Sequence, residues 1–429
     1  MKVLHTSDWH LGRSLYGQKR YAEFGQFLDW LSATIVSEQV DILLVAGDIF
    51  DTSTPSNRAQ SLYYQFLCQV SASPCRHIIV IAGNHDSPTF LDAPKALLRS
   101  LNVHVIGATT ENIDEEVLLL EDAQGRAELL VCAVPYLRDR DIRQVQAGES
   151  LADKDHNLLE GIREHYARVT ALAAAKRQDL GLNIPIIAMG HLFTAGGKTI
   201  DGDGVRELYV GSLAHVHGSI FPPCIDYVAL GHLHVPQKIG GAEHIRYSGS
   251  PVAMGFGEAT QQKSVCLIEF SAEANNLGTN NLAANNLATT GAVKPDVTLL
   301  NVPVFQPLRQ VSGNWASIAS ELRSLVDSNE SVWLEVIYQG DEIVSDLRER
   351  LETLTEGSEL LILRIQNTRL IERVLNASDT DQSLEDLDVN DVFARCLAAH
   401  DVPEDQQADL LHTYQQTLNA IHHDDTQAE

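Results

Sequence analysis

The chain has 429 residues, which is too long for one ordinary domain, and its 44% apolar and 21% charged residues are typical of a soluble globular protein with packed cores. No run of about 18 consecutive apolar residues is present, so no membrane-spanning helix is expected. The formal net charge of −27 disfavours a protein that binds nucleic acid mainly through a basic surface, because such binding depends on Lys and Arg neutralising phosphates.

The distribution of charges and cysteines refines this description. Between Asn376 and Glu429 we count 13 Asp or Glu and one Arg, so 13 minus 1 places −12 of the net charge in this segment. Met1 to Gly12 carries Asp8 and His10 where a signal peptide would be apolar, and we therefore expect a cytoplasmic protein. The six cysteines form no C-x-x-C pair, which indicates reduced, packed thiols.

Strands and helices alternate in the first hundred residues. Continuous apolar runs predict strands at Lys2 to His5, Asp41 to Ala46 and His77 to Ala82. Apolar residues at helical spacing predict helices between them, at Arg20 to Glu38 and Asn57 to Val70. Apolar strands that alternate with amphipathic helices indicate an α/β fold in which helices cover a sheet.

The pattern changes after Leu101 to shorter strands. They are expected at Val103 to Ile106, Val117 to Leu120 and Leu129 to Val134, and a helix is expected near His156 to Gln178. Further strands precede Gly190 and Gly231, and a strand at Lys263 to Phe270 closes the segment. The whole region to about residue 272 is therefore predicted to be one layered α/β domain.

Five short polar motifs stand where predicted strands end. They are Asp8-Trp9-His10, Gly47-Asp48, Gly83-Asn84-His85-Asp86, Gly190-His191 and Gly231-His232-Leu233-His234. A single motif of this kind is usually a turn or a packed histidine, but five in order are not expected from turns alone. Their carboxylate, imidazole and amide groups suit two divalent metal ions that share one site, which is a means of cutting phosphate esters.

The spacing of the motifs supports one common site. Asp48 follows Asp8 by 40 residues and Asn84 follows Asp48 by 36, and each interval accommodates one strand-helix crossover. Adjacent parallel strands would then bring these motifs to one sheet edge. Residues two apart in an extended chain point to the same face, so we expect Asp8 and His10 to do so, and likewise the two histidines of the last motif.

The remaining glycines and histidines have simpler interpretations. The glycines that precede Asp48, Asn84, His191 and His232 fit tight turns with positive φ. A second pair of histidines two residues apart is not directly preceded by a glycine as in the motifs, and we interpret it as structural or solvent-facing; it consists of His215 and His217.

These motifs resemble the signature of the calcineurin-like metallophosphoesterases. Four longer stretches narrow the resemblance to the SbcD family of nuclease subunits, and they are Thr6 to Gly12, Gly47 to Asp51, Ala229 to His234 and Arg246 to Pro251. The resemblance covers about residues 1 to 375 in order and is weaker at the C-terminus. It implies a four-layer fold, in which a two-sheet β-sandwich is flanked by helices, together with a small α+β capping domain and a C-terminal helical tail.

The resemblance also implies roles for individual residues. Asp8, His10 and His234 would bind one metal ion, Asn84, His191 and His232 a second, and Asp48 would bridge the two. The metal would be Mn²⁺, and the mixed N and O ligands are compatible with it without excluding Zn²⁺ or Fe²⁺.

His85 would be the catalytic histidine, either as proton donor to the leaving sugar oxygen or as stabiliser of the developing charge. Asp86 would orient it or, as we favour, cap a helix or form a turn. Archaeal and eukaryotic relatives carry a histidine where this chain has Asp51, so Asp51 receives no substrate role. Basic residues near the motifs are candidates for DNA contacts, with solvated surface charge as the alternative; they are Arg13, Lys19, Arg20 and Lys198.

The first domain, at 1–272, is the expected nuclease domain. Three further segments are expected beyond it, and they are an Asn-rich linker or insertion at 273–296, a capping domain for DNA recognition at 297–375 and an acidic tail at 376–429. The linker holds three pentapeptide repeats, too few to build a β-helix. The capping domain is predicted to contain strands at Thr298 to Val304, Val332 to Tyr338 and Glu359 to Ile365, and helices at Trp315 to Val326 and Ile343 to Leu354.

The acidic tail contains two short amphipathic helical patterns. Their apolar residues are Val392, Phe393, Cys396 and Leu397, then Leu411, Tyr414, Leu418 and Ile421. Such helices cannot form a core of their own, so they either pack back on the body or bind a partner helix. The resemblance favours partner binding, because the family docks this region on the coiled coil of the SbcC ATPase.

The resemblance thus implies a two-metal DNA nuclease subunit of an SbcCD-like complex, a homodimer within a heterotetramer, that is cytoplasmic and nucleoid-associated. It would act as a 3′–5′ exonuclease on double strands and as an endonuclease on single strands and hairpins in DNA end processing, repair and recombination. An alternative is a metallophosphoesterase that acts on small phosphodiesters or phosphoproteins, which the acidic charge would suit. A non-catalytic ATPase scaffold is a third hypothesis, against which the full set of ligand residues argues.

Overall fold

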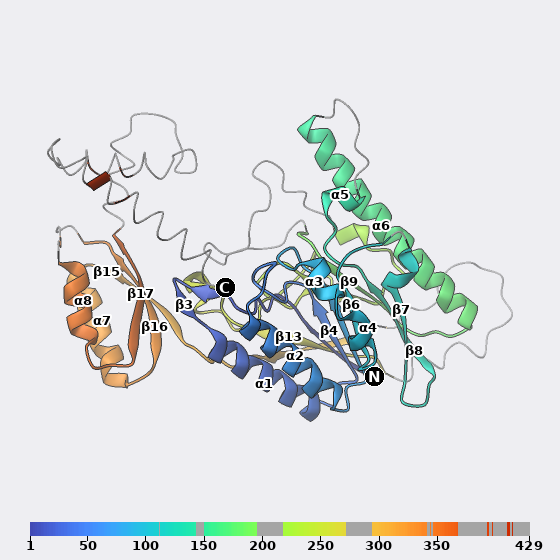
Figure 1. The fold of residues 1–429 in the computed structure, drawn as a ribbon, viewed down its shortest axis with the longest axis horizontal. Coiled ribbons are helices and arrows are strands. Elements are labelled where there is room, and N and C mark those ends of the chain that lie inside the picture. The colour runs from blue at the N-terminus through green and yellow to red at the C-terminus, as the bar shows by residue number, and fades with distance from the viewer. Residues whose placement is uncertain are drawn as a thin grey trace. The chain divides into compact units, whose positions relative to one another are not determined.

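Two six-stranded sheets form the framework of the first part of the molecule (Figure 1). The computed structural model describes residues 1–110, 112–142, 150–194, 218–271, 294–340, 344 and 346–367, with 393, 397, 410, 411 and 414. The chain forms two compact units, Met1–Gln306 and Pro307–Glu429. Several features of the sequence lie outside the described residues, and they are Lys198, His215, His217, the pentapeptide repeats and most of the acidic tail.

The first sheet has the order β14-β13-β1-β4-β5-β6. Its strands are β1 (Lys2–Thr6), β4 (Ile42–Ala46), β5 (His77–Ile81), β6 (Val103–Ile106), β13 (Ser264–Glu269) and β14 (Asp296–Asn301). The neighbours β1, β4, β5 and β6 are parallel, whereas β13 is antiparallel to both β1 and β14. The parallel pairing predicted from the crossover spacing is therefore confirmed.

The second sheet has the order β11-β12-β10-β9-β8-β7. Its strands are β7 (Val117–Glu121), β8 (Ala127–Ala133), β9 (Ile186–His191), β10 (Tyr227–Gly231), β11 (Gln237–Lys238) and β12 (Ile245–Tyr247). The central strands β8, β9, β10 and β12 are parallel, and the outer strands are antiparallel to their neighbours. A small hairpin of β2 (Ser14–Leu15) and β3 (Gln18–Lys19) precedes the first long helix.

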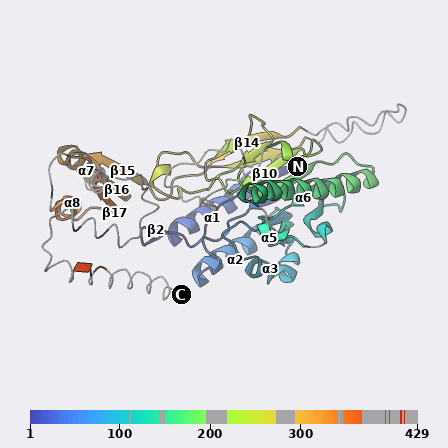
Figure 2. The ribbon, with the colours of Figure 1, turned by 90° about the horizontal axis from the view of Figure 1, so that it is seen from above.

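Helices cover the outer face of each sheet. On the first sheet α1 (Tyr21–Ser37) and α2 (Asn57–Ser71) lie side by side, while the long α6 (Leu151–Leu180) packs on the second sheet (Figures 1 and 2). Shorter helices connect the strands, and they are α3 (Pro88–Asp92), α4 (Lys95–Arg99), α5 (Asp139–Ile142), η1 (Ile113–Glu116), η2 (Gly218–Ile220) and η3 (Phe256–Glu258).

Three apolar cores define four layers. Alternate residues of β4 point to opposite faces, so Leu43 packs under α1 and α2 while Leu44 packs between the two sheets. Val228 of the second sheet packs under α6. Strands that are buried on both faces must be apolar throughout, which is why they appear as continuous apolar runs in the sequence. The expected four-layer α/β fold is confirmed.

Local sequence explains where the helices begin and end. The α2 helix begins after Ser56, whose side chain accepts a hydrogen bond from the Ala59 amide at 3.2 Å. A capping box of Ser150 and Asp153 begins α6, and Gly181, with φ +64°, ends it. A polar run, Asp153 to Asn157, follows the first two residues of α6, so apolar spacing alone places the start of the helix several residues too late.

The second unit contains a parallel three-stranded sheet of β15 (Leu308–Gly313), β16 (Val332–Tyr338) and β17 (Leu360–Asn367). Helices α7 (Trp315–Ser328) and α8 (Leu347–Thr355) pack on it around a core that includes Val311, Leu322 and Leu334. The predicted strand at Thr298 to Val304 is instead β14, which pairs with β13 in the first unit. The strand that takes its place, β15, is not evident in the sequence because it contains few apolar residues among polar ones.

The described helices include none suited to a lipid bilayer, since none of them combines the length and the apolarity that crossing a membrane requires. The described cysteines are all free thiols, and they are Cys68, Cys75, Cys132, Cys224 and Cys266. Cys75, Cys132 and Cys266 are buried as expected for packed thiols, whereas Cys68 is exposed and Cys224 is half-buried.

Candidate metal centre

The polar motifs follow strands that are neighbours in the two sheets. Asp8 follows β1, Asp48 follows β4 and Asn84 follows β5, in adjacent positions of the first sheet. His191 ends β9 and His232 follows β10, which are adjacent in the second sheet. Because the carboxyl ends of both sets of strands face the same region, all seven predicted ligand residues are brought together.

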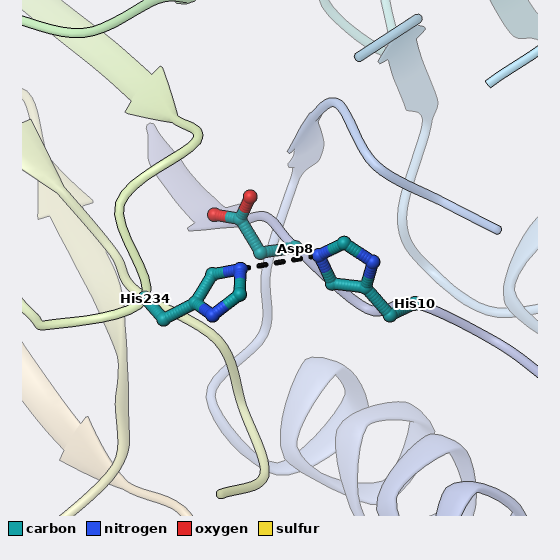
Figure 3. A group of neighbouring side chains, drawn as sticks. All are labelled: Asp8, His10 and His234. Atoms are coloured by element: carbon teal, nitrogen blue, oxygen red, sulfur yellow. Dashed lines mark hydrogen bonds between the residues drawn. The ribbon is translucent and has the colours of Figure 1, made fainter. Parts of the chain in front are cut away.

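One cluster consists of Asp8, His10 and His234 (Figure 3). Their ligand atoms lie within 4.8 Å of one another, and all three residues are buried. The Nε2 atoms of His10 and His234 are 3.2 Å apart. Asp8 is held by its surroundings, because it accepts hydrogen bonds from the Ser7 hydroxyl at 2.5 Å and from the His232 amide at 2.9 Å.

A second cluster contains Asp48, His191, His232 and Asn84. The ligand atoms of the first three lie within 4.8 Å of one another. The Asn84 side-chain oxygen lies 3.0 Å from His191 Nε2 and 2.9 Å from His232 Nδ1. Asp48 lies between the clusters, since its Oδ2 atom is 3.3 Å from His191 Nε2 and 3.5 Å from His10 Nε2.

The donor atoms fit divalent cations. Two imidazole nitrogens that face each other at 3.2 Å, as those of His10 and His234 do, can share at most one proton. Buried carboxylates and imidazoles are costly to desolvate without a partner, and a cation between them offsets that cost. Histidine, carboxylate and amide ligands together suit first-row divalent metals.

The charges in the second cluster are strongly polarised. Burial raises the pKa of Asp48, but His191 and His10 outweigh it and hold the pKa well below the usual value. Burial lowers the pKa of His191, but the Asp48 carboxylate outweighs it and raises the pKa to about 9. The extra proton of His191 thus lies beside Asp48, at a place where a bound cation would interact with the same carboxylate.

The backbone at these residues differs from the expected extended chain. Asp8, His10 and Asp48 have φ of 53°, 46° and 51°, and His232 has φ of 103°, all in the left-handed region. The prediction that the two-residue spacing acts through an extended strand is therefore wrong. Instead Trp9, which separates the two predicted ligand residues in the chain, has its side chain buried in the core. Strained backbone of this kind is often found at functional sites.

Parallel hydrogen bonding continues beyond the ends of β1 and β4. The Asp8 amide donates to the Gly47 carbonyl at 3.0 Å, and the His10 amide donates to the Asp48 carbonyl at 3.0 Å. Leu11 and Phe50 then form a parallel bridge. These backbone contacts fix the first and second motifs side by side.

The glycines of the motifs serve mainly to leave space. Of the four, Gly47 has positive φ, at +87°, while Gly83, Gly190 and Gly231 do not. A Cβ atom on Gly83 would lie 2.1 Å from Asp48 Oδ1, and one on Gly231 would lie 1.9 Å from the carbonyl oxygen that ends β4. The expectation of four positive-φ turns is thus wrong for three positions, where close packing of the loops excludes a side chain.

Replacing Gly231 with alanine is expected to lower the free energy of unfolding by about 1–3 kcal/mol, because the added Cβ atom would overlap backbone. Gly25, at a half-buried position of α1, provides a matched control, since a Cβ there would lie 3.8 Å from Leu62. Gly25→Ala should leave stability unchanged or raise it by about 0.5–1 kcal/mol. Chemical denaturation measures both variants, and equal stability of the two would contradict the packing argument.

Two carboxylates that orient predicted ligands were not identified from the sequence. His10 Nδ1 lies 3.3 Å from Asp51 Oδ1, and His234 Nδ1 lies 3.6 Å from Glu258 Oε1. Contacts of this kind fix the orientation of a metal-binding imidazole. Asp51 lies within one of the stretches that carry the family resemblance, and its position three residues after Asp48 of the second motif is a signal that could have found it. No local signal points to Glu258.

A backbone carbonyl plays the same part for a third imidazole. His191 Nδ1 donates to the Ala46 carbonyl at 2.9 Å, so that Nε2 faces the carboxylate of Asp48. Because Ala46 ends β4 of the first sheet and His191 ends β9 of the second, this bond joins the two sheets at the site. Such a bond also sets which nitrogen of the ring is free to bind a metal.

His85 is placed by two hydrogen bonds. Its backbone amide donates to Asp48 Oδ1 at 2.9 Å, and its Nδ1 donates to the Asp51 carbonyl at 2.8 Å. The imidazole lies next to His10, with ring centroids 4.8 Å apart. Asp86 does not orient it, because its carboxylate accepts hydrogen bonds from three backbone amides, as in the turn role that we favoured; they are those of Gly83, Ile49 and Phe50.

A buried ion pair lies beside the predicted ligand His234. Lys263 Nζ lies 2.5 Å from Glu258 Oε2 and donates to the His234 carbonyl at 3.1 Å. Burial raises the pKa of Glu258, but His234 and Lys263 outweigh it and lower the pKa to about 2. If either Lys263 or Glu258 were replaced by an uncharged residue, the charge of the other would stay buried without a partner, which is unfavourable.

Replacing Lys263 with methionine is therefore expected to lower the free energy of unfolding by about 3–5 kcal/mol. Lys2→Met is a matched control, because the pair of Lys2 with Glu269 is partly exposed and should contribute only about 0–1 kcal/mol. Thermal and urea unfolding curves compare the two variants. A loss for Lys263→Met no larger than for Lys2→Met would show that the buried pair contributes little.

Comparison with known proteins agrees with this geometry. The family model for calcineurin-like phosphoesterases matches residues 1–236, and a model described as the type 5 capsule protein repressor C-terminal domain matches residues 304–401. The chain is 38% identical to the SbcD subunit of nuclease SbcCD from Escherichia coli K12 over 424 residues, which is 98% of each chain.

Shorter matches link the chain to the same nuclease subunit in two further bacteria. The identity to the Rhodobacter capsulatus protein is 38% over 280 residues, covering 64% of this chain and 67% of the relative. The identity to the Bacillus subtilis protein is 38% over 274 residues, covering 63% of this chain and 66% of the relative.

Proposed function

Because the chain belongs to the SbcD family of calcineurin-like phosphoesterases, we propose that it is a metal-dependent DNA nuclease subunit that hydrolyses phosphodiester bonds. The observation that carries the proposal is the convergence of ligand residues from five strand ends on one buried site. A site used only for structure would have no need of a histidine, His85, beside the ligand residues. Hydrolysis of small diesters or phosphoproteins is the less favoured alternative.

We assign the metal ligands as two sets with one shared residue. One ion would be held by Asp8, His10 and His234. The other would be held by Asn84, His191 and His232, and Asp48 would be a ligand of both. Support comes from the position of Asp48 Oδ2, which is within 3.5 Å of an imidazole nitrogen of each set. We propose Mn²⁺ as the metal, because the mixed nitrogen and oxygen donors are compatible with it.

When bound, two such ions supply positive charge for the phosphate and lower the pKa of a water nucleophile. The protein contributes orientation and proton transfer. Donation from His85 Nδ1 to the Asp51 carbonyl fixes the tautomer of a neutral imidazole and leaves Nε2 available on the other side of the ring. In its protonated form His85 would donate from Nε2 to the leaving sugar oxygen.

The finer functional assignments rest on the family. We propose 3′–5′ exonuclease activity on double strands, endonuclease activity on single strands and hairpins, and a role in DNA end processing, repair and recombination in the cytoplasm, associated with the nucleoid. We further propose capping by residues 297–375 and docking of the tail, 376–429, on a coiled-coil ATPase of the SbcC type. The complex would be a heterotetramer with a homodimer of this chain.

A labelled hairpin duplex tests the proposal directly. The full chain would be incubated with Mn²⁺, with and without the partner ATPase and ATP, and in parallel with a small diester such as bis(4-nitrophenyl) phosphate. Cleavage of the hairpin supports the DNA nuclease. Hydrolysis of the small diester alone would support the alternative, and activity on neither substrate in any condition would indicate a non-catalytic scaffold.

A further inference from the structure

A cavity of about 600 Å³ opens beside the candidate metal centre. Asn84 belongs both to its lining and to the second ligand cluster, so the cavity is continuous with the site. Its volume lies within the range of about 300–1,000 Å³ that is common for ligand pockets. Its other polar lining residues include Ser87, Thr89, Asp92 and Arg138. The site therefore has room on one side for a group larger than the scissile phosphate.

Arg138 is positioned by the segment that follows β8 of the second sheet. The Tyr136 amide donates to the Ala82 carbonyl at 2.9 Å, which ties this segment to the end of β5 in the first sheet. The Tyr136 ring packs edge-on against His191 with centroids 6.2 Å apart. Arg138 Nη2 donates to the Asp86 carbonyl over a long 3.4 Å. The half-buried Arg138 thus lines the cavity next to the loop that carries the third motif.

The other arginines near the motifs are already paired with carboxylates. Arg20 is 2% exposed, forms a buried ion pair with Glu23 and donates to a backbone carbonyl. Arg13 pairs with Asp51. No residue in the described part of the chain forms an ion pair with Arg138. A guanidinium in a cavity without a carboxylate partner is suited to an anionic ligand.

The carboxylates that line the cavity form no ion pair with Arg138 in the described part of the chain. Asp86 directs its oxygens to three backbone amides. Asp92 accepts a hydrogen bond from the Gly107 amide at 3.0 Å. Asp141 also lines the cavity, and it takes part in an interaction of its own. The guanidinium of Arg138 therefore keeps most of its five N–H donors available.

We propose that this cavity is a second phosphate subsite, in which Arg138 binds the backbone phosphate next to the scissile one. The inference rests on the proposed function and adds to it a residue that selects a polynucleotide over a small diester. An arginine can hold a phosphate through two parallel hydrogen bonds, which positions the strand without reading its sequence. The net charge of −27 makes such a local cation more important than it would be on a basic protein.

Binding of a labelled, nuclease-resistant phosphorothioate oligonucleotide, measured before cleavage occurs, provides a test that does not depend on cleavage. Fluorescence anisotropy with the full chain and Mn²⁺ would be measured over a range of salt concentrations. Arg138→Ala should weaken binding about 10- to 100-fold, as expected for a lost charged hydrogen bond. It should also reduce the slope of log affinity against log salt by about 0.7–1, which a merely structural change would not do.

Two further variants complete the experiment. Arg138→Lys should recover the salt slope but only part of the affinity, because an ammonium lacks the fork of the guanidinium. Arg163→Ala, at an exposed arginine of α6 paired with Glu160, should bind like the wild type. In cleavage assays the loss for Arg138→Ala should be at least about 10-fold larger on the oligonucleotide than on bis(4-nitrophenyl) phosphate.

The outcomes separate this inference from the proposed function. An unchanged affinity and salt slope for Arg138→Ala would overturn the subsite, even if the wild type cleaves DNA. Equal losses on the two substrates would also overturn it, since Arg138 would then act through the geometry of the metal centre. A wild type that binds the oligonucleotide but hydrolyses neither substrate would contradict the proposed function, while the binding data would still decide the role of Arg138.

Discussion

Replacing His85 with alanine is expected to lower the rate of DNA cleavage by a factor of about 10²–10⁴, the usual contribution of a general acid or base. The imidazole is lost, but the backbone amide of residue 85 still donates to Asp48 Oδ1, because that bond does not involve the side chain. The side chain of His85 belongs to neither of the two proposed ligand sets, so the variant should still bind two metal ions. Loss of activity without loss of metal is therefore the specific expectation.

Single-turnover cleavage of a labelled hairpin duplex measures the rate, and elemental analysis of the purified protein measures metal content. His244→Ala is a suitable control, because His244 is exposed and lies at the amino end of β12. The site lies at the carboxyl end of β10, which is parallel to β12, so His244 is at the opposite end of the sheet. Full activity in His85→Ala would rule out the proton-transfer role. A reduced metal content would show that His85 supports the metal centre instead.

Replacing Asp48 with asparagine is expected to remove both metal binding and activity. The substitution keeps the volume of the side chain but removes the negative charge that lies between His10 and His191. Loss of a partner outside the ligand shell commonly weakens metal affinity by about 10–100-fold, and a shared ligand should matter more than that. We therefore expect Mn²⁺ affinity to fall more than about 100-fold. Chelation of the wild-type protein should likewise abolish cleavage.

Isothermal titration with Mn²⁺ measures the number and affinity of the bound ions, and cleavage is followed at increasing Mn²⁺ concentrations. Asp29→Asn, at an exposed position of α1, changes the net charge equally and should behave like the wild type. If Asp48→Asn bound two ions with wild-type affinity, Asp48 would not be a shared ligand. If it lost a single ion, Asp48 would belong to one set alone.

Local sequence patterns predicted much of the framework. The apolar runs of β1, β4 and β5 and the crossover spacing between Asp8, Asp48 and Asn84 were enough to predict adjacent parallel strands. Parallel strands joined by helices have few arrangements, so ligand motifs at their carboxyl ends meet. The strand β15 was missed, and β14 was assigned to the wrong sheet, because strand pairing between distant segments leaves no local periodic signal.

The kinds of ligand atoms at the site and their order along the chain follow from the sequence, because each motif comes directly after its own strand. The contacts that hold the site do not follow from it. Glu258 reaches His234, Arg138 reaches the loop after β5, and Gly231 packs against the end of β4, in each case between segments distant in the chain. These contacts depend on distances between loops that are set when the two sheets pack together. The same distances decide which cationic side chains, such as Arg138, remain available to bind a ligand.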